Sequence, residues 1–339
     1  MRRAVGIGIG VVVAGGVFIF VLPKIASYRA VWDTIQELTW PQIAALALAT
    51  LLNIVTFAPP FMATLPGLGF LRALVVTQAS TASTYIAPGG AAVGMVLAYA
   101  MLRGWGFEPA AVALAVALTG AWNQLFMFGA PAIALALLAH EGGSNPLLRT
   151  VALIGLAVFV VALAAFAAAL WRDRFAQRVG DTAARIATWA MHLIRREGVT
   201  WGGASLVAFR RGAVGLLRRR WWILTLATIA GQLTVFGVLL TCLRTLGVSA
   251  EEVTLVEAFA GWTLVRLLGS LPITPGGLGV VELGLTGALV GFGGPNDAVV
   301  AAVLLYRALT ILPTLVLGLL AGVAWRRLRP DPVLEGVEH

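Results

Sequence analysis

The chain has 339 residues, of which 60% are hydrophobic and 12% charged, and its formal net charge is +9. Its apolar runs exceed the roughly 20 residues that span a bilayer, which excludes an ordinary soluble domain and predicts an all-α polytopic membrane protein. The single cysteine, Cys242, excludes a disulfide framework or a cysteine-rich metal site within one chain.

Residues 1–40 predict a first transmembrane helix followed by an external interfacial helix. Two arginines precede the apolar run from Ala4 to Leu22, and no clear signal-peptide cleavage site follows it. The basic start places the N-terminus in the cytoplasm. The mixed segment 28–40 carries Trp32 and Trp40, which suit the headgroup region of a bilayer.

Residues 41–139 predict a helix, a broken hairpin and a further helix. Pro59 and Pro60 bend or break the first helix. The segment 70–103 is interrupted by three consecutive helix breakers, which are Pro88, Gly89 and Gly90. The part before the break is rich in serine and threonine. We therefore interpret the two parts as a helical hairpin that enters the membrane and returns. Pro109 sits at the expected first turn of the next helix.

Residues 140–220 predict a transmembrane helix followed by a cytoplasmic segment rich in arginine. Eleven arginines and three acidic residues lie between Arg172 and Arg220. Cytoplasmic loops of membrane proteins are typically basic. Apolar residues at helical spacing within 175–193 indicate an amphipathic helix on the inner leaflet, either as a topology anchor or as a sensor of lipid headgroups. No recognition motif or interleaved aromatics support nucleic-acid binding, which we do not expect.

Residues 221–325 predict the same order of a helix, a broken hairpin and a helix. The segment 255–292 contains a second break at Pro272–Gly279, and the residues that break the helix here are Pro272, Pro275, Gly276 and Gly277. After the last helix, residues 326–339 are predicted to form a cytoplasmic tail. In hydrocarbon, freed backbone groups must find new partners, so such a break belongs in the protein interior or beside a water-filled cavity.

The two broken segments share a sequence pattern, since Ile86-Ala-Pro-Gly-Gly90 matches Ile273-Thr-Pro-Gly-Gly277. With both termini in the cytoplasm, the first hairpin enters from the cytoplasm and the second from outside. The sequence therefore predicts an inverted repeat of helix–broken re-entrant hairpin–helix units. This architecture is common in secondary transporters, whose sites lie where the broken segments meet.

Charged residues within the apolar segments are the main site candidates, because a mid-membrane charge is costly and needs an interior partner. Glu282 pairing with Arg307 or Arg266 would lock the fold; alternatively, one or both arginines bind a phosphate. The two interpretations are compatible, since a pair can open when a headgroup arrives. Further candidates for substrate binding are Tyr306, Tyr85, Ser83, Thr84, Asn123 and Gln124.

Catalytic and cofactor signals are weak along the whole chain. Neither His140 nor His192 is placed with neighbouring ligands for a metal, and no nucleotide-binding loop of the Walker type occurs. We therefore expect no metal, no cofactor and no enzymatic activity.

The motif Pro275-Gly-Gly-Leu-Gly-Val-Val-Glu282 together with Tyr306-Arg307 resembles the integral-membrane region of the lysylphosphatidylglycerol synthase, or multiple peptide resistance factor, family. Pro88-Gly-Gly90 and its Ser/Thr-rich approach resemble it too, and the similarity covers roughly residues 5–325. The resemblance implies a lipid flippase region. In that family a separate soluble domain transfers the aminoacyl group, and this chain ends shortly after its last helix, so synthase activity is not expected.

The leading hypothesis is a plasma-membrane protein that moves a phospholipid or a polyprenyl-phosphate-type lipid between leaflets. Its partners would be membrane lipids with an anionic headgroup. The alternative is a non-transporting subunit that binds lipid, or that docks a separate lipid-modifying enzyme through the arginine-rich segment. The lipid, the energy coupling and the oligomeric state stay open.

Overall fold

The structure is a computed structural model that describes residues 36–87, 90–141, 203–270 and 275–328, with scattered positions between 150 and 177. Within these ranges the regular structure is helical, with no strand. The predicted first transmembrane helix, most of the interfacial helix, the amphipathic helix within 175–193 and most of the tail lie outside the described residues.

Four helical segments of the described ranges are long and apolar enough to cross a membrane, and two shorter helices are also apolar. The four segments are Trp40–Thr64, Pro109–His140, Val207–Thr245 and Asn296–Trp325. The prediction of an all-α polytopic membrane protein is therefore confirmed.

The first part of the fold contains a bent helix and a hairpin. Helix α4 (Trp40–Thr56) is followed by the short helix α5 (Pro59–Thr64), which begins with two prolines at its first turn. The predicted interruption at Pro59 is thus a true helix break. Helices α6 (Phe70–Ile86) and α7 (Gly90–Gly104) then pack against each other as the predicted hairpin.

Two long helices follow. Helix α8 (Pro109–Glu141) begins where Pro109 predicts, and the Glu108 carboxylate accepts hydrogen bonds from the N–H groups of its first turn. Helix α11 (Gly203–Thr245) begins at Gly203 and not at Trp221. Because arginine is a good helix former and no proline interrupts this stretch, the basic residues before Trp221 continue the same helix.

The second broken segment has three parts. Helix α12 (Leu255–Gly269) ends before the break, the 3₁₀ turn η2 (Pro275–Gly277) lies within it, and helix α13 (Val280–Gly291) follows it. The last long helix, α14 (Asn296–Arg327), packs against both α6 and α13.

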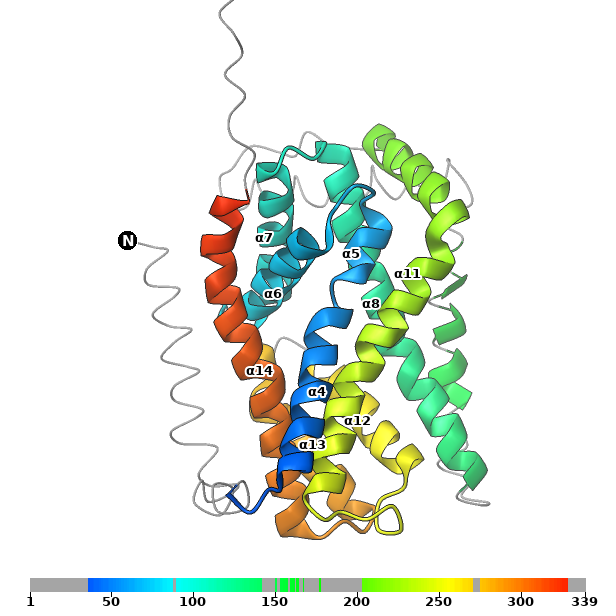
Figure 1. The fold of residues 1–339 in the computed structure, drawn as a ribbon. Helices are drawn as coiled ribbons and strands as arrows, with labels where there is room; N and C mark the ends of the chain where they lie inside the picture. Colours follow the sequence, from blue (N-terminus) through cyan, green and yellow to red (C-terminus); the bar gives the residue numbers. More distant parts are fainter. Residues whose placement is uncertain are drawn as a thin grey trace, which may run out of the picture.

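The two hairpins lie end to end along α14, with their open ends at opposite ends of this helix (Figure 1). At the C-terminal end, Arg72 of α6 donates from Nη2 to the Leu328 carbonyl at 3.3 Å. At the N-terminal end, Val253, two residues before α12, shares a buried cluster with Val299 of α14. The broken ends of both hairpins therefore face the middle of the bundle.

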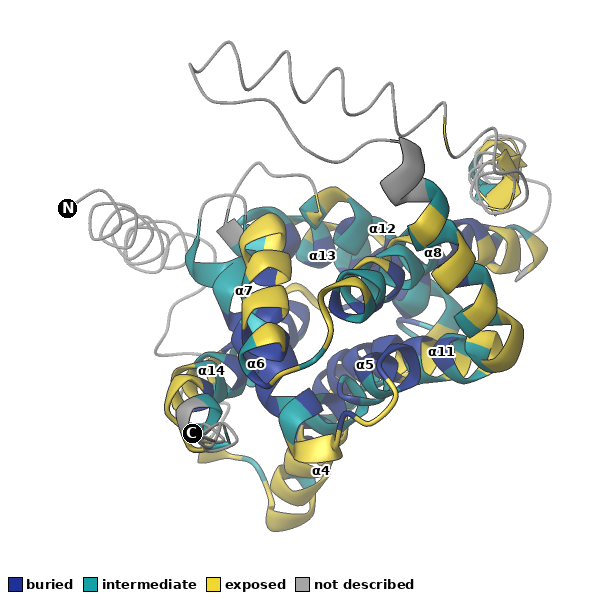
Figure 2. Ribbon diagram, turned by 90° about the horizontal axis from the view of Figure 1, so that it is seen from above, coloured by how far each residue is buried: buried dark blue, intermediate teal, exposed yellow. Residues whose placement is uncertain are grey.

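Many residues on the outside of the bundle are exposed (Figure 2), and many of these are large and apolar. Exposed examples on α4, α7 and α14 are Leu48, Leu51, Val96, Leu319, Leu320 and Val323. Such an apolar exterior would be a liability in water, and it is what a helix bundle presents to lipid. Conversely, the polar residues Gln232, Glu282 and Arg307 are buried.

Candidate functional site

The second break depends on three glycines with left-handed backbone. Gly276, Gly277 and Gly279 have φ values of 61°, 67° and 84°. This region disfavours side chains that carry a Cβ, so the Pro-Gly-Gly-x-Gly pattern allows the chain to turn from η2 directly into α13. Pro275 begins the turn, whereas Pro272 lies outside the described residues.

The two broken segments meet inside the bundle. The end of α6 contacts η2, and a Cβ added at Gly276 would overlap the ring of Tyr85. A Cβ added at Gly90, which begins α7, would likewise overlap the backbone of Thr84. Pro88 and Gly89 lie outside the described residues. Tyr85 is therefore the described residue that joins the first break to the second.

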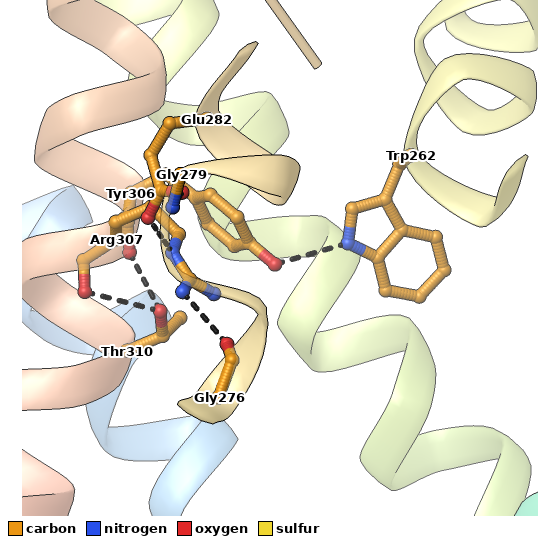
Figure 3. A network of polar contacts seen from close by, with 7 residues as sticks. All are labelled: Trp262, Gly276, Gly279, Glu282, Tyr306, Arg307 and Thr310. Carbon is orange, nitrogen blue, oxygen red and sulfur yellow. Dashed lines mark hydrogen bonds and ion pairs between the residues drawn. The ribbon is translucent and has the colours of Figure 1, made fainter. Parts of the chain in front are cut away.

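Glu282 and Arg307 form a buried ion pair at this junction (Figure 3). Arg307 donates from Nε to Oε1 of Glu282 at 2.6 Å, and the two residues are 9% and 2% exposed. Glu282 lies in the first turn of α13, and Arg307 lies on α14. Of the two partners that the sequence left open, Glu282 pairs with Arg307.

Backbone groups of the break complete this ion pair (Figure 3). Arg307 donates from Nη2 to the Gly276 carbonyl at 3.0 Å, and the Gly279 N–H donates to Oε2 of Glu282 at 2.6 Å. A buried pair offsets its desolvation only when such additional hydrogen bonds are present. The pair thus satisfies backbone groups that the broken helix leaves free.

Arg266 has a different environment from Arg307. Its Cζ lies 4.8 Å from the centre of the Trp262 ring, and its Nη1 is buried with no hydrogen-bond partner among the described residues. Trp262 is held in turn, because its Nε1 donates to the hydroxyl oxygen of Tyr306 at 3.2 Å (Figure 3). Arg266 is therefore close to the ion pair but is not part of it.

The hydroxyl groups of Ser83 and Thr84 bond to their own helix. Ser83 donates to the Ser80 carbonyl at 2.6 Å, and Thr84 donates to the Thr81 carbonyl at 2.7 Å. Such local bonds are the usual arrangement for these residues in membrane helices. They lie beside Tyr85 near the break, with their donors already occupied.

Asn123 and Gln124 lie on α8 and face different surroundings. The Oδ1 of Asn123 accepts a hydrogen bond of 2.5 Å from Nε2 of Gln232, which is buried on α11. Gln124 is exposed. Asn123 therefore joins α8 to α11. No contact among the described residues brings Gln124 to the ion pair.

Two residues that contact the predicted site residues, Trp262 and Gln232, were missed by the sequence analysis, and a third residue, the charged Glu257, has a structural role. Trp262 precedes Arg266 by four residues, so helical spacing alone places them on one face. Gln232 has no signal beyond being a polar residue in an apolar run. Glu257 is a helix cap, because Thr254 and Glu257 form a reciprocal capping box at the start of α12.

A narrow crevice lies between α8 and α12 beside Arg266. Its lining includes Phe126, Met127 and Pro131 from α8, and Trp262 and Arg266 from α12. The crevice leaves no room for a water molecule, so it is closed in this conformation.

Together, the apolar helices and the buried junction of two broken hairpins define a multi-pass α-helical membrane protein with a polar interior. The family model described as the lysylphosphatidylglycerol synthase TM region matches residues 7–318, so the chain belongs to this family. Membership associates this membrane region with the modification or flipping of lipids. No curated protein gives a significant match to the chain.

Proposed function

We propose that this protein moves a lipid between the two leaflets of the plasma membrane. The observation that carries the proposal is the meeting of two hairpins, inserted from opposite ends of the bundle, at the buried Glu282–Arg307 pair. Broken helices that meet near mid-membrane are the usual site-forming elements of secondary transporters. Membership in a family associated with lipids favours a lipid as the substrate.

The lipid headgroup crosses between the hairpin ends while its tails stay in the bilayer. Because Tyr85 packs closely on Gly276 and the crevice is closed in this structure, passage requires that Tyr85 separates from Gly276 and that the crevice widens. Separating the hairpin ends costs free energy, because Arg307 bonds to the Gly276 carbonyl and Glu282 bonds to the Gly279 N–H, and movement of the break would strain or break these hydrogen bonds. A headgroup phosphate offsets this cost by accepting hydrogen bonds from arginine.

The substrate class in this proposal is a lipid with an anionic phosphate, such as a phospholipid or a polyprenyl phosphate. The hairpins form an inverted repeat, and both chain termini lie in the cytoplasm. Lipid movement, and not chemistry on the lipid, is its task.

Transbilayer movement of a labelled lipid tests the proposal. Purified protein is reconstituted into liposomes that contain phosphatidylglycerol with a fluorescent headgroup label, and an impermeant reductant destroys the label in the outer leaflet. We expect inner-leaflet label to become accessible faster than in protein-free liposomes. If labelled phosphatidylglycerol and a labelled polyprenyl phosphate both move at the protein-free rate, the proposal is wrong.

A non-transporting subunit is the second candidate, and the closed crevice beside Arg266 is the observation that favours it. In that case the Glu282–Arg307 pair has a structural role only, and the protein binds lipid or a separate lipid-modifying enzyme. Lipid that co-purifies with the protein, combined with no transbilayer movement in liposomes, would favour this candidate.

A further inference from the structure

The two parts of α8 on either side of Pro131 have different packing partners. Before Pro131, Leu118 shares a buried cluster with Leu224 of α11. After Pro131, Ala134 shares a different buried cluster with Ala260 of α12. Helix α8 therefore belongs to two packing units, and Pro131 lies between them.

Hydrogen bonds hold the part of α8 before Pro131 to α11. Trp122 donates from Nε1 to Oγ1 of Thr225 at 2.8 Å. One residue later, Oδ1 of Asn123 accepts a hydrogen bond of 2.5 Å from Nε2 of Gln232. The part after Pro131 is instead held to α12 by apolar packing. The two parts therefore follow different neighbours when the bundle changes shape.

The crevice lies where these two packing units meet. Its α8 wall ends at Pro131, and its α12 wall extends to Arg266. The two helices are antiparallel here, because the apolar cluster joins Ala134 to Ala260, whereas the crevice joins earlier residues of α8 to later residues of α12. A turn of α8 about Pro131 would therefore keep the apolar cluster and separate the helices towards the end of α12, where the second break begins.

Pro131 also marks the place where α8 bends most readily. A proline inside a helix has no N–H to donate to the carbonyl four residues earlier, and its ring crowds that carbonyl. Sharp bends of long helices occur mainly at such prolines. The crevice thus lies beside the weakest point of α8.

The α12 wall of the crevice is held more firmly than the α8 wall. Trp262 donates to the hydroxyl oxygen of Tyr306, and its ring packs on Phe236 and Phe259 at centroid distances of 5.4 and 5.8 Å. From α8, Phe126 meets the same ring edge-on at 6.4 Å. Opening of the crevice therefore separates Phe126 from Trp262 and leaves Trp262 in place.

We propose that α8 and α12 form a gate to the junction of the two hairpins, with Pro131 as its hinge and the cluster of Ala134, Leu138 and Ala260 as its fixed end. In the open state, the part of α8 before Pro131 swings away from Trp262, and the crevice widens towards the second break. This inference rests on the proposed function, because the gate admits the lipid headgroup that the protein moves.

The accessibility of single cysteines tests the gate without a measurement of transport. In a Cys242→Ala background, Ala130→Cys places one thiol in the crevice, and Ala134→Cys places one in the fixed cluster. Modification by N-ethylmaleimide in detergent is followed by mass spectrometry of the intact protein. Because local opening exposes only the crevice, we expect Ala130→Cys to react about tenfold faster. Equal rates at the two positions would overturn the proposal.

Pro131→Ala tests the hinge in the Ala130→Cys protein. Alanine supplies an N–H that bonds within the straight helix and must be released when α8 bends, so modification should slow by about twofold to tenfold. Pro313→Ala is the matched control, because it removes a proline from the interior of α14 and should leave the rate unchanged. An unchanged rate in Pro131→Ala, or an equal effect of Pro313→Ala, would overturn the hinge.

Pairs of cysteines test the role of the gate in lipid movement. Ala130→Cys with Thr263→Cys spans the crevice. Ala134→Cys with Ala260→Cys spans the fixed cluster and is the control. Each pair is joined by a short thiol crosslinker in liposomes, again in the Cys242→Ala background. The crevice crosslink should slow lipid movement about tenfold or more, since it blocks opening, and the control crosslink should leave the rate unchanged. An unchanged rate with the crevice crosslink formed would overturn the gate.

Failure of this inference and failure of the proposed function give different results. If Ala130→Cys reacts faster than Ala134→Cys and Pro131→Ala slows it, but the wild type moves no lipid in liposomes, the gate stands and transport is wrong. If the wild type moves lipid and the crevice crosslink does not slow it, transport stands and the gate is wrong.

Discussion

Arg307 donates to Glu282 at 2.6 Å and thereby joins α14 to the first turn of α13. At a rise of about 1.5 Å per residue, Arg307 lies roughly 17 Å along α14 from Asn296 and roughly 30 Å from Arg327. The ion pair is therefore far from both ends of this long helix. It stabilises the second break at the depth where the first break meets it.

The first prediction concerns the charge of Glu282. Glu282→Gln leaves Arg307 buried without a counter-charge, which should lower the free energy of unfolding by about 3–5 kcal/mol. Denaturation in detergent, followed by circular dichroism, measures this change. The double variant Glu282→Gln with Arg307→Gln should lose less unfolding free energy than the two single variants lose together. The reason is that neither charge is then left buried without its partner.

Asp297→Asn is the control for this experiment. Asp297 is exposed in the first turn of α14, where its carboxylate contributes about 0.3–1 kcal/mol through the helix dipole. If Glu282→Gln were as mild as Asp297→Asn, the ion pair would not stabilise the junction.

The second prediction concerns the backbone of the break. Gly276→Ala should destabilise the protein by about 1–2 kcal/mol through its left-handed backbone, and further through overlap with Tyr85. Adding Tyr85→Ala should restore the part that is due to overlap. Thermal unfolding of the three variants in detergent separates the two contributions.

Gly287→Ala provides the matched control within α13. A Cβ at Gly287 meets nothing within 4 Å, and the residue is in ordinary helical conformation. This change should be neutral or stabilising by up to about 1 kcal/mol. Equal effects of Gly276→Ala and Gly287→Ala would contradict the described junction.

Prolines and glycines made much of the fold predictable. Pro59, Pro109 and Gly276 mark helix ends that local backbone chemistry alone requires. The partner of Glu282 was not predictable, because Arg266 and Arg307 lie on different helices and their packing registers decide which one reaches it. The capping role of Glu257 was predictable from the sequence, since Thr254-x-x-Glu257 is a capping-box pattern.

The third prediction concerns the contact between α6 and α14. A Cβ at Gly318 would overlap Ala82 and approach the Gln78 carbonyl, whereas a Cβ at Gly322, one turn later, meets nothing within 4 Å. Gly318→Ala should destabilise the protein by about 1–3 kcal/mol, the range for overpacking a core. Gly322→Ala should be close to neutral, and detergent denaturation measures both. Equal stability of the two variants would show that the first hairpin does not pack closely on α14.

The fourth prediction separates a structural carboxylate from a functional one. Glu257→Ala removes the capping box of α12 and should cost about 0.5–2 kcal/mol of stability. Lipid movement per folded molecule should stay at the wild-type rate, because Glu257 bonds to Thr254 at the open end of the hairpin. Glu251→Ala, at an exposed loop position, is the control. A loss of lipid movement in Glu257→Ala alone would assign this carboxylate a functional role.

The rate of transbilayer lipid movement in liposomes that carry Gly276→Ala, relative to Gly287→Ala, tests the central claim most directly. Both variants add one methyl group to the second broken segment, and only Gly276 lies where the two hairpins meet. With equal amounts of folded protein reconstituted, we expect Gly287→Ala to move labelled phosphatidylglycerol at the wild-type rate and Gly276→Ala to move it much more slowly. Wild-type rates for both variants would contradict passage through this junction.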